Sequence, residues 1–172
     1  RAGDYLFTPD APQTPDQVVD RLLKGEVLSV KVTLPEGLRL DEQAALLEQA
    51  GLGQAADFIK AARDPNLVKK LGIEADSLEG YLFPDTYLVP KNATVEQILT
   101  WQVERFRSAW KKAEAKRQDG VSLNMHQAVT LASIVEKETG QAHERPRISC
   151  VFHNRLKKNM KLQTDPTVIY SV

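Results

Sequence analysis

Short helical patterns, each bounded by a start and a stop signal, constrain the fold of this chain more than any other feature. In residues 124–140, Asn124 and Gln127 form a capping-box pattern, and apolar residues then recur with the helical period until Gly140. This pattern predicts an amphipathic helix with one face toward a core. The same signals predict further helices after Thr14, from Leu40 to Gly51, within 54–71, after Thr94 and from Glu144.

Strand signals are few and short. Residues 27–34 alternate apolar and polar side chains, which predicts a strand, and residues 5–7 form a shorter strand-like run. Residues 78–90 are rich in aromatic side chains and bounded by Gly and Pro, which predicts an ordered loop with a short extended piece. We therefore expect a helix-rich α+β fold with one main domain and a small appendage.

The charge and cysteine content narrow the classes of function. Lys plus Arg equals Asp plus Glu at 23 each, so no net field recruits nucleic acid or an acidic membrane surface. Cys150 is the single cysteine, which excludes an internal disulfide, and we expect it to be a small buried residue.

The sequence has no long apolar segment and two abrupt ends. It lacks an apolar run of about 18 residues and a basic-then-apolar leader, so we expect these residues to be soluble as they stand. It begins at Arg1 and stops at Val172 without a helix stop or a polar tail. We expect the chain to be part of a longer protein.

Glu138 is the strongest candidate for a catalytic residue. It lies three residues after Val135 and seven after Leu131, so it continues the apolar stripe that we expect to face the core. Glu136 lies on a less apolar face. A carboxyl group against apolar surface favours its neutral form, which general-acid catalysis needs near neutral pH. The alternative is that residues 136–138 are ordinary surface polarity before the helix stops.

Other kinds of active site have little support. His143, Cys150 and His153 lie close together in the sequence, but no second Cys or paired His motif completes a zinc site. We therefore predict no metal and no cofactor. No glycine-rich phosphate loop is present, and Ser133 does not lie in the strained turn of serine hydrolases.

Hydrogen-bonding side chains crowd the C-terminal stretch around Pro166. On a rigid loop they would suit a polyhydroxylated ligand, although a turn in which Asp165 caps the next segment is the simpler interpretation. The side chains are those of Gln163, Thr164, Asp165, Thr167 and Tyr170.

Several motifs occur together in an order typical of one protein family. They are Leu-Glu-Gly-Tyr-Leu-Phe-Pro-Asp-Thr at 78–86, Leu-Ala-Ser-Ile-Val-Glu-Lys-Glu-Thr at 131–139, and residues 144–170 with Phe-x-Asn-Arg-Leu and Leu-Gln-Thr-Asp-Pro-Thr-Val-Ile-Tyr. The Leu-Pro-Glu-Gly-Leu turn at 34–38 accompanies them. Together they resemble the MltG (YceG-like) endolytic murein transglycosylases over essentially the whole chain.

The resemblance implies a domain organisation and a location. Residues 34–172 would form a lysozyme-like catalytic domain, and residues 1–33 would be part of a small N-terminal α/β, LysM-like subdomain. Family members continue past Tyr170 with an Asn-Thr-Tyr stretch and a Gly-Pro-rich segment, so we expect an incomplete groove. The family is anchored in the bacterial inner membrane by one span, here outside the chain, and faces the periplasm or the cell exterior.

The resemblance also implies a reaction and its residues. The family cleaves the β-1,4 bond between N-acetylmuramic acid and N-acetylglucosamine within peptidoglycan glycan strands, leaves a 1,6-anhydro end, and is associated with cell-wall synthases. Carried onto this sequence, the catalytic acid/base is Glu138, and Glu136 is the alternative acid. A noncatalytic peptidoglycan-binding or scaffolding module is the other class of function. The residues expected to line the sugar groove are Asn154, Gln163, Thr164, Asp165 and Tyr170.

Overall fold

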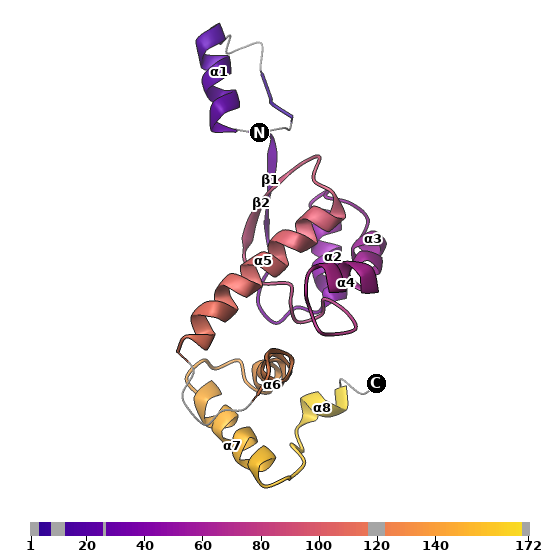
Figure 1. The fold of residues 1–172 in the computed structure, drawn as a ribbon, viewed down its shortest axis with the longest axis vertical. Coiled ribbons are helices and arrows are strands. Elements are labelled where there is room, and N and C mark those ends of the chain that lie inside the picture. The colour runs from indigo at the N-terminus through magenta and orange to yellow at the C-terminus, as the bar shows by residue number, and fades with distance from the viewer. Residues whose placement is uncertain (1–3, 8–12, 26, 117–122, 170–172) are drawn as a thin grey trace. The chain divides into compact units, whose positions relative to one another are not determined.

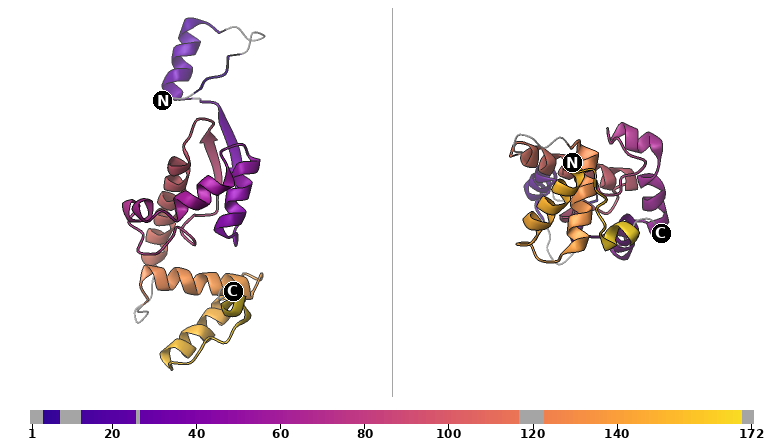
Figure 2. Two further views of the ribbon diagram at one scale, coloured as in Figure 1. Left: turned by 90° about the vertical axis from the view of Figure 1, so that its right-hand side faces the viewer. Right: turned by 90° about the horizontal axis from the view of Figure 1, so that it is seen from below.

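Helices predominate in the computed structural model, which describes residues 4–7, 13–25, 27–116 and 123–169 (Figures 1 and 2). The chain divides into two compact units, Arg1–Ala109 and Trp110–Val172. In the described part of the chain, strands occur only as one two-stranded antiparallel sheet. The prediction of a helix-rich α+β fold is therefore confirmed.

The sheet joins two segments of the first unit that lie far apart in the sequence. Strand β1 (Ser29–Thr33) pairs with β2 (Thr86–Pro90). Strand β1 was expected, and β2 lies where we expected a loop with a short extended piece. Residues 5–7 form no strand, so that prediction is wrong. The compact units meet at residue 109, and the expected domain boundary after residue 33 stays a prediction.

Between and after the strands, helices build the core of the first unit. The burial follows the predicted apolar faces, and Val89, Phe58 and Val103 are fully enclosed. Tyr81 packs edge-on against Phe106 with ring centroids 5.2 Å apart. The helices are α2 (Leu40–Gln49), α3 (Ala55–Ala62), α4 (Pro65–Lys70) and α5 (Val95–Glu114).

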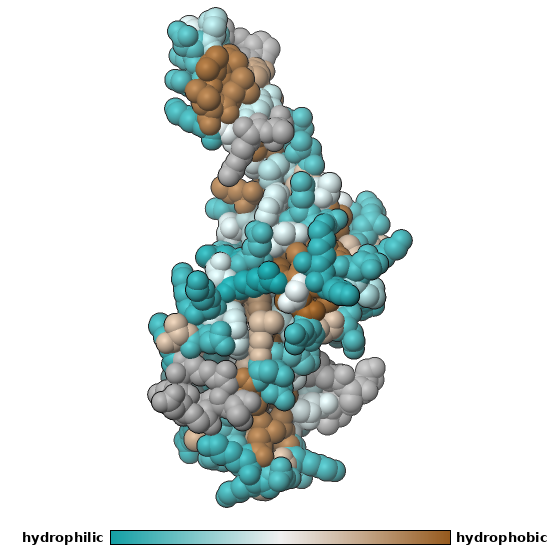
Figure 3. Space-filling view, viewed as in Figure 1, coloured by the Kyte–Doolittle hydropathy of each residue, from teal (hydrophilic) through white to brown (hydrophobic). Residues whose placement is uncertain are grey.

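Helix α1 (Pro15–Lys24) is amphipathic but buries none of its residues. Thr14 caps its start, and Gly25 ends it in the left-handed conformation with φ of 69°. Leu22 and Leu23 are exposed on its surface, where Figure 3 shows an apolar patch.

The second unit is helical in its described residues. Helix α6 (Met125–Glu138) contacts both α7 (Arg145–Lys157) and α8 (Asp165–Ile169). The predicted capping box is present, because the Gln127 backbone N–H donates to Asn124 Oδ1 at 2.8 Å and the Asn124 N–H donates to Gln127 Oε1 at 3.0 Å. The core is a small cluster made of Leu131, Ile134, Val135 and Phe152.

Two expectations about single features have different outcomes. Cys150 is exposed on α7, so the expectation of a buried thiol is wrong: its position falls outside the narrow face that buries Phe152. None of the helices in the described ranges is long and apolar enough to span a membrane.

Candidate active site

Glu138 is the last residue of α6 and is exposed. The expectation that apolar surface shelters it is therefore wrong. Glu138 lies on the same face of α6 as the buried residues Leu131 and Val135. It is the last residue of the helix, however, and the core cluster ends before it. The backbone then turns to an extended conformation, and Thr139 takes the buried position instead, with 8% of its surface exposed.

The C-terminal segment reaches Glu138 through one side-chain hydrogen bond. The Thr164 hydroxyl donates a hydrogen bond to Glu138 Oε2. Thr164 itself is buried, with 8% of its surface exposed. The bond therefore holds one carboxylate oxygen in place and leaves the rest of an exposed carboxyl group accessible.

Three contacts hold Thr164 in position beneath Glu138. Leu162 packs against the core cluster of the second unit, and Pro166 is buried on the other side of Thr164. The Arg155 guanidinium donates to the Leu162 carbonyl and ties the segment to α7. Gln163 has a φ of 51°, so the chain turns sharply just before Thr164.

The other predicted groove residues that the structure describes have different environments. Gln163 and Asp165 flank Thr164 in the sequence and are exposed. Asp165 is the first residue of α8, so it lies within that helix. Asn154 is exposed on α7 and donates to Cys150 Sγ at 3.6 Å, with no hydrogen bond to Glu138. Tyr170 lies outside the described residues.

Thr139 and Glu144 fix the chain directly after Glu138, a role that our sequence analysis did not assign. The Thr139 hydroxyl donates to Glu144 Oε2 at 2.6 Å and accepts from the Gln141 backbone N–H at 3.0 Å. These bonds join the end of α6 to the start of α7. The sequence signal at this place was the polar run that follows the apolar stripe. Such a run does not indicate which side chains bond to each other.

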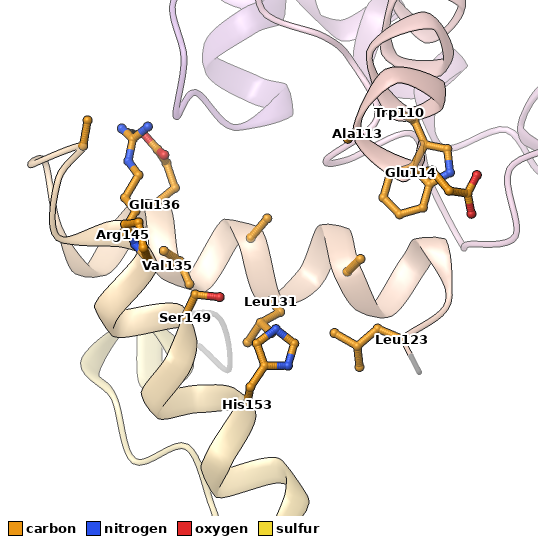
Figure 4. A pocket seen from close by; sticks show the side chains of 14 residues that line it. Trp110, Ala113, Glu114, Leu123, Leu131, Val135, Glu136, Arg145, Ser149 and His153 are labelled. Carbon is orange, nitrogen blue, oxygen red and sulfur yellow. Dashed lines mark hydrogen bonds and ion pairs between the residues drawn. The ribbon is translucent and has the colours of Figure 1, made fainter. Parts of the chain in front are cut away.

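Glu136 occupies a different environment from Glu138. It lines a cavity of about 560 Å³ in the second unit, together with Arg145, Ser149 and His153, and Glu138 is not among the lining residues (Figure 4). Arg145 Nη2 donates to Glu136 Oε1 at 3.0 Å, and the two side chains are 36% and 33% exposed. The ion pair occupies one oxygen of Glu136, so pairing with Arg145 is sufficient to explain why a carboxylate stands at this position.

The arrangement suits proton transfer more than metal chemistry. Among the described residues, no group of three His, Cys, Asp or Glu side chains converges on a point that would hold a metal ion. Glu138 offers a single accessible carboxyl group at the end of α6, positioned by a hydroxyl. Such a group can donate a proton to a bound substrate and take one back.

Comparison with known proteins places this geometry in context. A curated endolytic murein transglycosylase of Bacillus subtilis (strain 168) is 30% identical over 174 residues, which are 91% of this chain and 48% of that protein. One of Streptococcus pneumoniae serotype 2 is 30% identical over 169 residues, 85% of this chain and 30% of that protein. The chain thus spans about half the length, or less, of these curated relatives.

A solved structure and a family model agree with these relatives. The 2.6 Å crystal structure of a yceG-like protein from Listeria monocytogenes superposes with a TM-score of 0.72 at 33% identity, over 90% of this chain and 56% of that one. The model of the YceG-like family matches residues 1–172. This chain therefore belongs to the YceG-like family.

Proposed function

We propose that this chain carries the acid/base of an endolytic lytic transglycosylase that cuts peptidoglycan glycan strands. The observation that carries the proposal is the Glu138–Thr164 contact, which joins two of the motifs that carry the family resemblance. Membership of a family with relatives named endolytic murein transglycosylases supports this choice of substrate and reaction class.

One carboxyl group is sufficient for this reaction. Glu138 donates its proton to the glycosidic oxygen between N-acetylmuramic acid and N-acetylglucosamine as the C1–O bond breaks and positive charge develops at C1. The resulting carboxylate takes the proton of the muramoyl C6 hydroxyl. That oxygen then bonds to C1 and forms the 1,6-anhydro end, so no water is consumed and the carboxyl group is regenerated.

Because Glu138 is exposed, a bound glycan strand would change the surroundings of its carboxyl group. A polymer lying across the end of α6 would cover the carboxyl group and displace its water. Thr164 would hold the carboxyl group in the reactive orientation, and Gln163, Asp165, Asn154 and Tyr170 would contact the sugars beside it.

The domain assignment and location form part of the same proposal. We propose a lysozyme-like catalytic part and a LysM-like part that includes residues 1–33. We also propose an extracytoplasmic location with a membrane anchor outside this chain, as well as peptidoglycan strands and cell-wall synthases as partners. Family membership and the relatives named murein transglycosylases support an extracytoplasmic site of action.

Replacing each of the two candidate acids tests the proposal. In the full-length protein, Glu138→Gln should lower the formation of anhydro ends from purified murein by about a hundredfold or more, because the acid is lost while the shape is kept. Glu136→Gln should retain most of the activity. Glu104→Gln, an exposed change on α5, is the matched control. The products are identified by mass spectrometry.

Three outcomes would contradict parts of the proposal. Loss of turnover in Glu136→Gln but not in Glu138→Gln would move the acid to the cavity beside Arg145. Reducing ends in place of anhydro ends would mean hydrolysis by water. Full activity of Glu138→Gln in cells, with glycan binding lost on substitution of Asp165, would favour the noncatalytic binding module.

A further inference from the structure

A second pocket lies in the first unit, apart from the residues of the candidate active site. It has a volume of about 880 Å³, in the range of pockets that hold small ligands. Its walls come from the start of β1 and the residues just before it, from β2, from the turn after β2 and from the first turns of α5. The lining residues are Gly25, Val27, Ser29, Tyr87, Leu88, Pro90, Asn92, Ala93, Gln97 and Trp101.

The lining carries no formal charge, although 27% of the residues of the chain are charged. Burial raises the pKa of Tyr87 to about 12, so this phenol is neutral at physiological pH. Its hydroxyl donates to the Phe83 carbonyl at 2.6 Å, which fixes the ring in the wall. An ionic ligand would find no counter-charge among these residues, so the lining favours a neutral one.

Aromatic and amide groups stand side by side in this neutral wall. Gln97 and Trp101 are four residues apart on α5 and therefore neighbours on one face of the helix. Gln97 Oε1 accepts from the Thr94 N–H at 2.9 Å, which leaves the Gln97 amino group to donate elsewhere. The indole N–H of Trp101 and the side chain of Asn92 form no hydrogen bond within the ranges that the structure describes.

This combination matches the chemistry of an N-acetylated sugar. A pyranose ring has an apolar C–H face that packs on an aromatic ring, and its hydroxyl and acetamido groups pair with amides, hydroxyls and indole N–H groups. We infer that the pocket beside Trp101 binds uncharged N-acetylglucosamine-containing stretches of a glycan strand. The choice of glycan rests on the proposed function. With this pocket, the first unit would bind the polymer through residues other than those of the candidate active site.

The two tryptophans of the chain allow a direct test. The indole N–H signals of Trp101 and Trp110 are assigned by NMR with Trp110→Phe, and the chain is titrated with chitotetraose. We expect a saturable shift of the Trp101 signal while the Trp110 signal stays in place. Trp101→Ala should weaken binding at least about tenfold and Gln97→Ala about two- to tenfold. Ser108→Ala, on the same helix outside the pocket, should bind as the unchanged chain does.

The control ligand and the Glu138→Gln variant separate the inference from the proposed function. An absent Trp101 shift at millimolar chitotetraose, or an equal response to maltotetraose, would overturn the assignment to N-acetylated sugar. The shift should persist in Glu138→Gln, because that residue is not part of the pocket. A persisting shift together with undiminished murein cleavage by Glu138→Gln would refute the proposed catalytic role and leave the binding pocket in place.

Discussion

At the scale of single residues, the candidate site depends on a contact between two side chains that are 26 residues apart. Thr164 is buried and its hydroxyl reaches the carboxyl group of Glu138, whereas Glu136 is paired with Arg145. Two carboxylates two residues apart on one helix thus have different partners. The one without a cationic partner in the described contacts is the one that we assign to proton transfer.

Removing the Thr164 hydroxyl should weaken catalysis without removing the acid. In Thr164→Val the Glu138 carboxyl group loses its hydrogen bond but keeps its chemistry, so we expect turnover of murein to fall by about tenfold. Initial rates of anhydro-end formation at several murein concentrations measure the effect.

The controls for this variant distinguish positioning from folding. Thr164→Ser is the control for positioning, because it keeps the hydroxyl and should restore most of the rate. Thr167→Val is the control for folding, because it removes a hydroxyl that donates to the Thr164 carbonyl at 2.6 Å. A rate loss in Thr164→Val that comes only from weaker substrate binding, with an unchanged maximal rate, would assign Thr164 to the sugar groove instead.

At the scale of elements, helix α6 carries Glu138, and its start and end are fixed by different means. Asn124 and Gln127 cap the start through reciprocal hydrogen bonds that the sequence pattern predicted. At the end, the Thr139 N–H still bonds to the Val135 carbonyl at 3.4 Å, and the Thr139 hydroxyl bonds to Glu144 on the next segment. The local sequence therefore defines the start of α6, while a contact with the following segment defines its end.

Loss of the cap should destabilise the second unit. Asn124→Ala leaves the first N–H groups of α6 without their acceptor, and we expect a loss of about 1 kcal/mol in unfolding free energy. Urea denaturation followed by circular dichroism measures the change in midpoint. Thr130→Ala, an exposed change within α6, should stay within about 0.5 kcal/mol of the parent chain. Equal losses in both variants would mean that loss of the cap is not responsible.

At the scale of the whole molecule, burial is unevenly divided between the two units. All side chains with less than 2% exposure in the described part of the chain belong to the first unit, among them Phe58, Leu34 and Tyr81. The core of the second unit is a cluster of four residues with exposures of 4–8%. The unit that carries Glu138 therefore has the smaller core and should open more readily.

Amide hydrogen exchange tests this difference. We expect lower protection in α6 and α7 than in α2, α3 and the buried turns of α5. Phe152→Ala should cost about 3 to 5 kcal/mol and reduce protection in the second unit alone, and Phe58→Ala should do the same in the first. An equal loss of protection in both units after either change would show that they unfold together.

The sequence by itself determined the local structure of this protein. Cap and stop signals such as Asn124 with Gln127, or Thr14 with Gly25, act within a few residues, and the helices that they predicted are present. Strand β1 and the extended piece that contains β2 were also visible as local patterns. These features depend on backbone hydrogen bonds and side chains close in the chain, so short windows of sequence are sufficient to predict them.

Only the tertiary structure decided which side chains meet and which are covered. Periodicity gave Glu138 its angle around α6, yet its exposure depends on where the core ends along the helix axis. The contact between Glu138 and Thr164 and the pairing of β1 with β2 join distant segments, and no local pattern encodes such distances. Burial and long-range contacts are properties of packing, and packing is settled only when the whole chain has folded.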